Sequence, residues 1–188
     1  NDPTLGTFIT SFIDDMSDED ALDNENNPEN GAILEALSPP PATIIAATQV
    51  IREAGLMPSM DFVTDWHLER GSAIHAATAL WDQDDLDESV LDAALRGRVE
   101  AWKAFRAESG NRLQILEIEQ PAYSATYRFA GTADRVVMWD GRRAILELKS
   151  GGKQKHHAVQ VGGYQDLYDA PIGFVVYLTD SGRYTMIP

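Results

Sequence analysis

A predicted β-hairpin near the middle of the chain constrains the fold more than any other feature of the sequence. We expect one strand at residues 135–139, a tight turn at Asp140-Gly141 and the partner strand at residues 144–149. Because side chains alternate along a strand, Glu147 and Lys149 are expected to share one face. Leu146 and Leu148 are then expected to point the other way, into a core.

Two carboxylates and a lysine are predicted to meet on this hairpin. Asp134 begins the first strand and is expected to approach Glu147 across the hairpin, which supplies the hard oxygen ligands that Mg²⁺ or Mn²⁺ prefers. Lys149 cannot ligate a metal while it is protonated. It is suited to orienting or deprotonating an attacking water and to offsetting charge on a scissile phosphate. The alternative is an ordinary cross-strand ion pair on a solvated face.

Two pairs of residues at helical spacing accompany the hairpin. Gly71 and His75 lie one helical turn apart, and we expect the glycine to let its helix approach the sheet closely. Gln160 and Tyr164 have the same spacing on a later helix, where they can either reach a bound strand or buttress the lysine. For His75 alone, a satisfied core histidine is the alternative to a ligand.

Together these motifs resemble the PD-(D/E)xK nuclease superfamily, in particular its RecB-like and phage exonuclease-like branch. The resemblance covers roughly residues 42–180, and the motifs occur in the family's order. They are Gly71-x-x-x-His75, Asp134, Glu147-x-Lys149 and Gln160-x-x-x-Tyr164. The resemblance implies an α/β fold with a restriction-endonuclease-like core, in which helices flank a mixed central sheet after an N-terminal helical part.

The resemblance also implies roles for individual residues. Asp134, Glu147 and Lys149 would be catalytic, and His75 and the backbone carbonyl of Leu148 would join the two acids in holding one or two Mg²⁺ or Mn²⁺ ions. Gln160 and Tyr164 would position the nucleic acid. Gly71 and Glu119, the acid that follows the apolar run 113–118, would support the site.

The absence of cysteine excludes several classes of site. With no Cys in the chain, the four-cysteine iron–sulfur cluster found in one branch of the superfamily cannot form. Cysteine-ligated zinc and disulfides are excluded for the same reason, as suits a reducing compartment. The sequence shows no apolar run long enough for a membrane span and no secretory start, so we expect no membrane association and a location in the cytoplasm of a bacterial or phage-infected cell.

Charge is distributed unevenly along the chain. The net charge is −15, and residues 1–51 hold ten acids with no Lys or Arg. We expect an acidic and flexible N-terminal region at residues 1–40, followed by a single nuclease domain at residues 41–188. The acidic region is either a solvated tail or a polyanion that competes with DNA.

Regular elements are expected throughout the second part. We predict helices at 41–55, 62–81, 90–108 and 158–169, and strands at 113–119, 123–129, 132–139, 144–149, 173–179 and 183–187. The loop 150–157, which carries Lys153 and Lys155, follows Lys149 directly and suits contact with phosphates. Arg142 and Arg143 are expected to extend this basic strip.

The sequence therefore predicts a divalent-metal-dependent deoxyribonuclease, an exonuclease or end-processing enzyme of recombination, repair or phage DNA metabolism. Its substrate would be linear duplex or single-stranded DNA, and a recombination protein would be a possible partner. The alternative is a non-catalytic nuclease-fold protein whose acidic surface acts as a DNA-mimicking or protein-binding inhibitor. The sequence does not separate DNA from RNA as the substrate.

Overall fold

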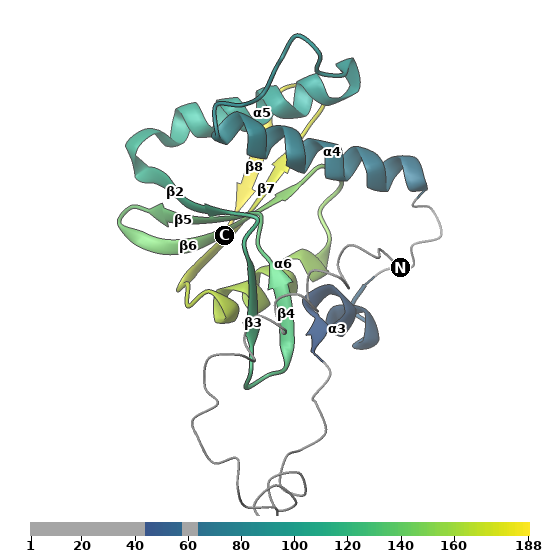
Figure 1. Cartoon of the computed structure of the whole chain (residues 1–188), viewed down its shortest axis with the longest axis vertical. Helices are drawn as coiled ribbons and strands as arrows, with labels where there is room; N and C mark the ends of the chain where they lie inside the picture. Colours follow the sequence, from purple (N-terminus) through teal and green to yellow (C-terminus); the bar gives the residue numbers. More distant parts are fainter. Residues whose placement is uncertain (1–43, 58–63) are drawn as a thin grey trace, which may run out of the picture. The chain divides into compact units, whose positions relative to one another are not determined.

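A computed structural model describes residues 44–57 and 64–188, which belong to one compact unit spanning Thr43–Pro188 (Figure 1). The expectations for the acidic region 1–40 lie outside the described residues. The described part is a mixed α/β structure with two mixed sheets and four α-helices.

The larger sheet has five strands in the order β2-β5-β6-β7-β8, and the smaller one has three in the order β1-β4-β3. In both sheets, parallel and antiparallel neighbours occur together, as at β6–β7 and β5–β6. The strands are β1 (Ile45–Ala46), β2 (Leu113–Ile118), β3 (Pro121–Ser124), β4 (Phe129–Thr132), β5 (Arg135–Trp139), β6 (Arg142–Lys149), β7 (Ile172–Leu178) and β8 (Tyr184–Ile187). The helices are α3 (Ala47–Glu53), α4 (Asp65–Asp82), α5 (Ala93–Ser109) and α6 (Lys155–Leu167), with a short 3-10 helix at Gly110–Arg112.

The β5–β6 hairpin confirms the prediction from the sequence. The two strands pair antiparallel, with Trp139 opposite Arg142. Asp140 and Gly141 both have positive φ, at 49° and 77°, as a two-residue type I′ turn requires. This turn therefore fixes the register that places Glu147 and Lys149.

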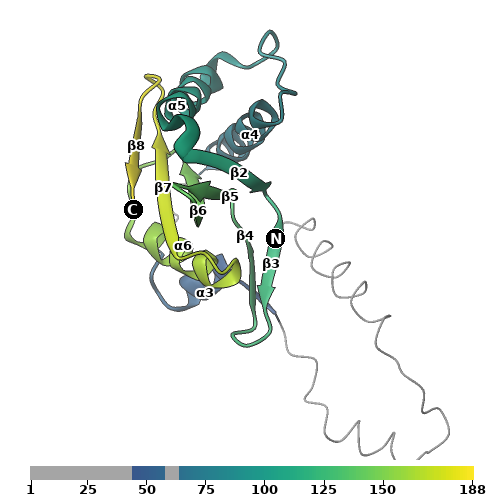
Figure 2. The same cartoon turned by 90° about the vertical axis from the view of Figure 1, so that its left-hand side faces the viewer.

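The five-stranded sheet is covered on both faces, and β6 shows why the alternation matters. Leu146 and Leu148 point into a core formed with α4 and α5, whereas Ile145 points into a second core formed with α6 and α3. Figure 2 shows α4 and α5 on one side of these strands and α6 and α3 on the other. Glu147 follows Ile145 at the strand period, so it lies on the α6 face as predicted.

Two predicted elements differ in the structure. The helix expected from residue 41 begins only at Ala47, because Ile45–Ala46 pairs with β4 as a short parallel strand. The single strand expected at 123–129 is instead divided between β3 and β4, which form an antiparallel hairpin. Its turn contains Arg128 at φ 56°, a left-handed conformation that the sequence does not predict for an arginine.

The remaining elements agree with the predictions to within a few residues. Helix α5 begins after Asp92, whose carboxylate accepts a hydrogen bond from the N–H of Ala94 as an N-cap. Trp102 and Phe105 on this helix are fully buried core residues. Among the described helices, none is long and apolar enough to cross a membrane.

Candidate active site

The predicted site residues converge at one end of the five-stranded sheet. Asp134 directly precedes β5, and Lys149 ends β6. Since these strands are antiparallel, the start of one and the end of the other lie together. Helix α4 brings His75 to this end, and α6 brings Gln160, so four elements contribute side chains.

Asp134 links α4 to the hairpin through both of its carboxylate oxygens. Its Oδ1 lies 2.8 Å from Nδ1 of His75, and its Oδ2 accepts a 2.6 Å hydrogen bond from the backbone N–H of Leu148. The acid is nearly buried, at 7% exposure. His75 is thus joined to an acid of the hairpin, a contact that a metal ligand and a satisfied core histidine would both make.

A second chain of hydrogen bonds runs from β6 into α6. Nζ of Lys149 donates to Oε1 of Glu147 at 2.8 Å and to Oε1 of Gln160 at 3.1 Å. Nε2 of Gln160 in turn donates to the hydroxyl of Tyr164 at 3.0 Å. Gln160 and Tyr164 are both buried, so of the two roles left open by the sequence, their contacts are those of residues that buttress the lysine.

Tyr164 is held in place by a close approach of β4. A Cβ added at Gly131 would lie 2.5 Å from Cε1 of Tyr164 and 3.3 Å from Cβ of Ala47. Any larger residue at position 131 would therefore displace the ring or the strand.

Electrostatics favour a charged His75–Asp134 pair. Burial opposes ionisation of both groups, but the mutual attraction and the hydrogen bond between them outweigh it. The pKa of His75 is consequently raised above its usual value, and the pKa of Asp134 is lowered, helped by Lys149 and by the N–H of Leu148.

For Glu147, the effects that oppose ionisation are the stronger ones. Burial, followed by repulsion from Asp134, raises its pKa from 4.5 to about 7, although Lys149 and His75 act to lower it. Burial tends to lower the pKa of Lys149, but Glu147 and Asp134 together raise it. Oε2 of Glu147 is buried and has no hydrogen-bond partner among the described residues. An orphaned carboxylate oxygen of this kind is the type of group that a cation would satisfy.

Glu119 lies closer to the site than the sequence indicated. Ligand atoms of His75, Glu119 and Asp134 all fall within 4.8 Å of one another. The backbone of Glu119 is left-handed, at φ 49°, and its N–H donates to the carbonyl of Asp134 at 3.2 Å. That turn directs an exposed acid toward the metal-ligand candidates, and nothing in the residue type alone signals it.

An open cavity of about 310 Å³ borders these residues and is lined by Gly71, Ser72, His75, Ala76 and Glu119. The reason predicted for Gly71 is wrong. A Cβ at this position would meet nothing within 4 Å, so the glycine does not serve a close approach of the helix to the sheet. It instead faces the open space next to His75.

The donor set fits a hard divalent cation. Carboxylates of Asp134, Glu119 and Glu147 and the imidazole of His75 offer oxygen and nitrogen ligands without any thiolate. Leu148 contributes its N–H to Asp134, and ligation by its carbonyl stays a prediction.

The predicted basic strip is divided in the structure. Lys153 and Lys155 are exposed directly after Lys149. Arg143 lies toward the opposite end of β6, about 20 Å away along the strand, where it pairs with Glu117 at 2.7 Å. Arg142 precedes it at the same end. Lys153 and Lys155 therefore follow the end of β6 that carries Lys149, whereas the arginine pair lies toward its other end, and Lys155 is the first residue of α6 and not part of a loop as predicted.

Comparisons with known proteins leave the family unassigned. No protein-family model matches the chain, and no curated protein matches it. The crystal structure of SSO0001 aligns over 85% of this chain and 78% of its own, at 17% sequence identity and a TM-score of 0.33. A likeness at this level carries no argument about function, which must come from the site itself.

Proposed function

We propose that this protein is a divalent-metal-dependent deoxyribonuclease with a restriction-endonuclease-like core of the PD-(D/E)xK type. One observation carries the proposal. His75, which lies far from the hairpin in sequence, and Asp134, Glu147 and Lys149 of the hairpin form linked hydrogen-bonded pairs at one end of one sheet. Oε2 of Glu147 is a buried carboxylate oxygen that no described group satisfies.

His75, Glu119 and Asp134, whose ligand atoms lie within 4.8 Å of one another, would hold the ion, and the unpartnered Oε2 of Glu147 would make Glu147 a further ligand. A bound Mg²⁺ or Mn²⁺ supplies Lewis-acid stabilisation of a phosphate and lowers the pKa of water.

Lys149 is placed where its ammonium could act on the attacking water. It is held by Glu147 on one side and Gln160 on the other, and its side chain is 19% exposed, so its ammonium is both oriented and accessible. From there it can orient the attacking water and offset the negative charge that develops on the scissile phosphate. Gln160 and Tyr164 keep that ammonium in place without touching the substrate.

Two exposed lysines that follow the site in the chain, Lys153 and Lys155, would contact the DNA backbone. Nζ of Lys153 lies 5.7 Å from the ring centre of Tyr177 on β7. Contacts with phosphates depend little on base sequence, so the two lysines suit general DNA binding.

The test is cleavage of linear and circular DNA with Mg²⁺ or Mn²⁺. We expect cleavage that chelation abolishes and that Glu147→Gln or Lys149→Ala lowers by about 100-fold or more. Glu117→Gln is the matched control, because it removes a carboxylate that pairs with Arg143 of β6 and makes no described contact with Asp134, Glu147 or Lys149. Selective loss of linear substrate would identify an exonuclease or end-processing enzyme.

The alternative function is a DNA-mimicking or protein-binding inhibitor, and the observation that favours it is the net charge of −15. Purified protein that leaves DNA intact with either metal, or a Glu147→Gln variant that cleaves as fast as the wild type, would contradict the nuclease proposal.

A further inference from the structure

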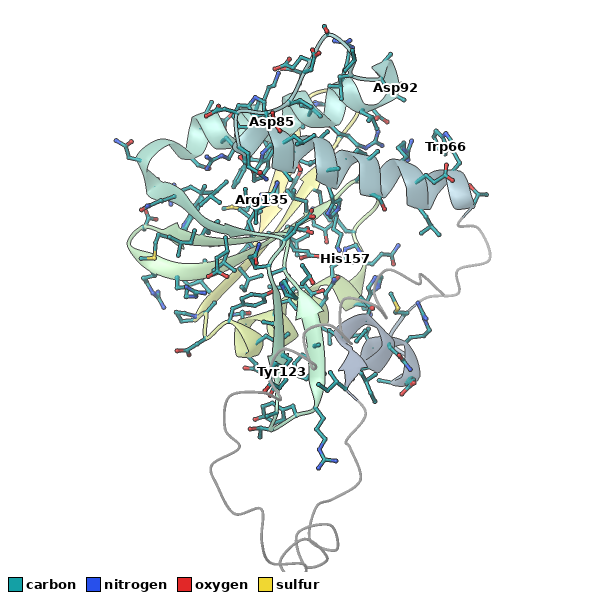
Figure 3. All side chains as sticks on the ribbon, in the orientation of Figure 1. Trp66, Asp85, Asp92, Tyr123, Arg135 and His157 are labelled. Atoms are coloured by element: carbon teal, nitrogen blue, oxygen red, sulfur yellow. The ribbon has the colours of Figure 1, made fainter. Side chains whose placement is uncertain are left out.

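A fully buried arginine lies directly behind the candidate metal site. Arg135 follows Asp134 in the chain and has no exposed surface. Figure 3 shows it between α4 and the sheet. Its partner is Asp82, the last residue of α4, whose side chain is also fully buried and which belongs by sequence to an acidic linker.

Each guanidinium nitrogen of Arg135 has its own acceptor. Nε donates to Oδ2 of Asp82 at 2.9 Å, Nη1 donates to the carbonyl of Asp134 at 2.6 Å, and Nη2 lies 3.4 Å from Oγ1 of Thr78. Two of these acceptors belong to α4 and one belongs to the turn before β5. The arginine thus ties the helix to the hairpin at three points.

Through these contacts Arg135 is connected to His75, Glu119 and Asp134, the three residues whose ligand atoms lie close together. Thr78 donates its hydroxyl to the carbonyl of His75 at 2.9 Å. The Asp134 carbonyl that accepts from Arg135 also accepts from the N–H of Glu119. One planar cation therefore contacts the backbone of Asp134 directly and those of His75 and Glu119 through one intermediate group each.

Stability alone does not require a charged group here. Removing two charges from water costs several kcal/mol per ion, and well-packed apolar residues commonly serve as well. Asp82 also faces Arg106 at 3.1 Å, which adds to the charge held in the interior. What an apolar pair cannot supply is a set of directed hydrogen bonds to two separate chain segments.

We propose that Arg135, oriented by Asp82, is a positioning residue that sets the placement of His75, Glu119 and Asp134 relative to one another. The proposal rests on the proposed metal site for its functional consequence, whereas the placement itself is a property of the chain. Lysine has one nitrogen in place of three and cannot reproduce the fork. Arg135→Lys therefore keeps the charge and removes the geometry.

The experiment measures Mn²⁺ affinity by calorimetry for the wild type, Arg135→Lys and Thr78→Val. We expect Arg135→Lys to bind Mn²⁺ about 10- to 100-fold more weakly, the usual effect of losing a group that orients ligands. Thr78→Val removes the hydroxyl that connects Nη2 of Arg135 to the carbonyl of His75 and leaves the other two contacts of the guanidinium, so we expect a weaker loss of a few-fold. If Arg135→Lys does not fold, Thr78→Val tests the proposal in its place.

Leu113→Ala is the stability control. Leu113 is buried at the far end of β2, opposite Trp139, and its truncation destabilises the core without touching the ligand-bearing segments. If Arg135 acted only through global stability, Arg135→Lys and Leu113→Ala would both bind Mn²⁺ as the wild type does while they remain folded, because the apparent affinity falls only with the folded fraction.

A second measurement needs no metal. The N–H of Leu148 donates to Asp134, so its amide resonance in an NMR spectrum reports where that carboxylate lies. We expect the resonance to shift and its exchange with solvent to accelerate in Arg135→Lys and not in Leu113→Ala. An unchanged Leu148 amide together with Mn²⁺ affinity within two-fold of the wild type would overturn the proposal. If the wild type binds no Mn²⁺, the proposed function fails, and the amide still decides the positioning role.

Discussion

Glu147→Gln is expected to stabilise the metal-free protein at alkaline pH while it removes activity. In the folded protein the pKa of Glu147 is raised from 4.5 to about 7, chiefly by burial and then by Asp134. Between pH 4.5 and pH 7, Glu147 consequently keeps its proton in the folded state and has lost it in the unfolded state. Stability therefore falls as the pH rises through this window.

The magnitude follows from the difference in pKa. Each pKa unit corresponds to about 1.4 kcal/mol, so ionising Glu147 in the folded protein costs at most about 3 kcal/mol once the pH exceeds 7. Between pH 5 and pH 8 the loss is about 2–3 kcal/mol. Glutamine keeps the shape and stays neutral, which removes this dependence. Lys149 retains Gln160 as an acceptor.

The assay is urea unfolding with EDTA at pH 5 and pH 8, comparing wild type, Glu147→Gln and Glu117→Gln. We expect Glu147→Gln to have the smaller loss of free energy of unfolding between the two pH values, and Glu117→Gln to behave as the wild type. Excess Mg²⁺ should largely cancel the difference between the wild type and Glu147→Gln at pH 8, because a ligand present at 100 times its Kd stabilises the wild type by about 2.7 kcal/mol. The reasoning is refuted if, with EDTA, Glu147→Gln shows the pH dependence of the wild type.

Three further outcomes follow from the structure. Burial lowers the pKa of His157 to about 4, so neutral His157 stabilises the folded protein fully above pH 6.5, and this stabilisation is lost as the pH falls from 6.5 toward 4. His157→Gln should therefore lose about 1–2 kcal/mol less free energy of unfolding than the wild type over this range, measured by urea unfolding. Binding of Mn²⁺ at pH 7 should release about half a proton from Glu147, measured as a calorimetric heat that depends on the buffer. Gly131→Ala should cost about 1–3 kcal/mol in thermal unfolding by displacing Tyr164, whereas Gly151→Ala, which meets open space, should cost far less.

The hairpin could be predicted because its signals are local. Asp140-Gly141 specifies the turn type, and the turn fixes which residues of β6 face α6. The helical pairing of Gly71 with His75 and of Gln160 with Tyr164 is equally local, and both pairs lie on the predicted helices.

Features set by tertiary contacts could not be predicted in the same way. The turn between β3 and β4 uses Arg128 in a left-handed conformation, where sequence rules look for Gly or Asn. Glu119 reaches the site through a left-handed backbone that its hydrogen bond to Asp134 supports. Asp82 belongs to an acidic run that resembles a solvated linker, and only the folded chain places two arginines against it.

The charges of the site explain why protons and a metal ion would compete for it. The site holds three carboxylates against one lysine and one histidine: Glu119 and Asp134 lie near His75, and Glu147 pairs with Lys149. Without another cation the chain reduces this excess by holding protons, and the raised pKa values of His75 and Glu147 express that tendency. A divalent cation would replace both protons with one ion. His75 and Glu147, whose pKa values are raised, are both proposed ligands, so metal affinity should rise with pH until both have lost their protons.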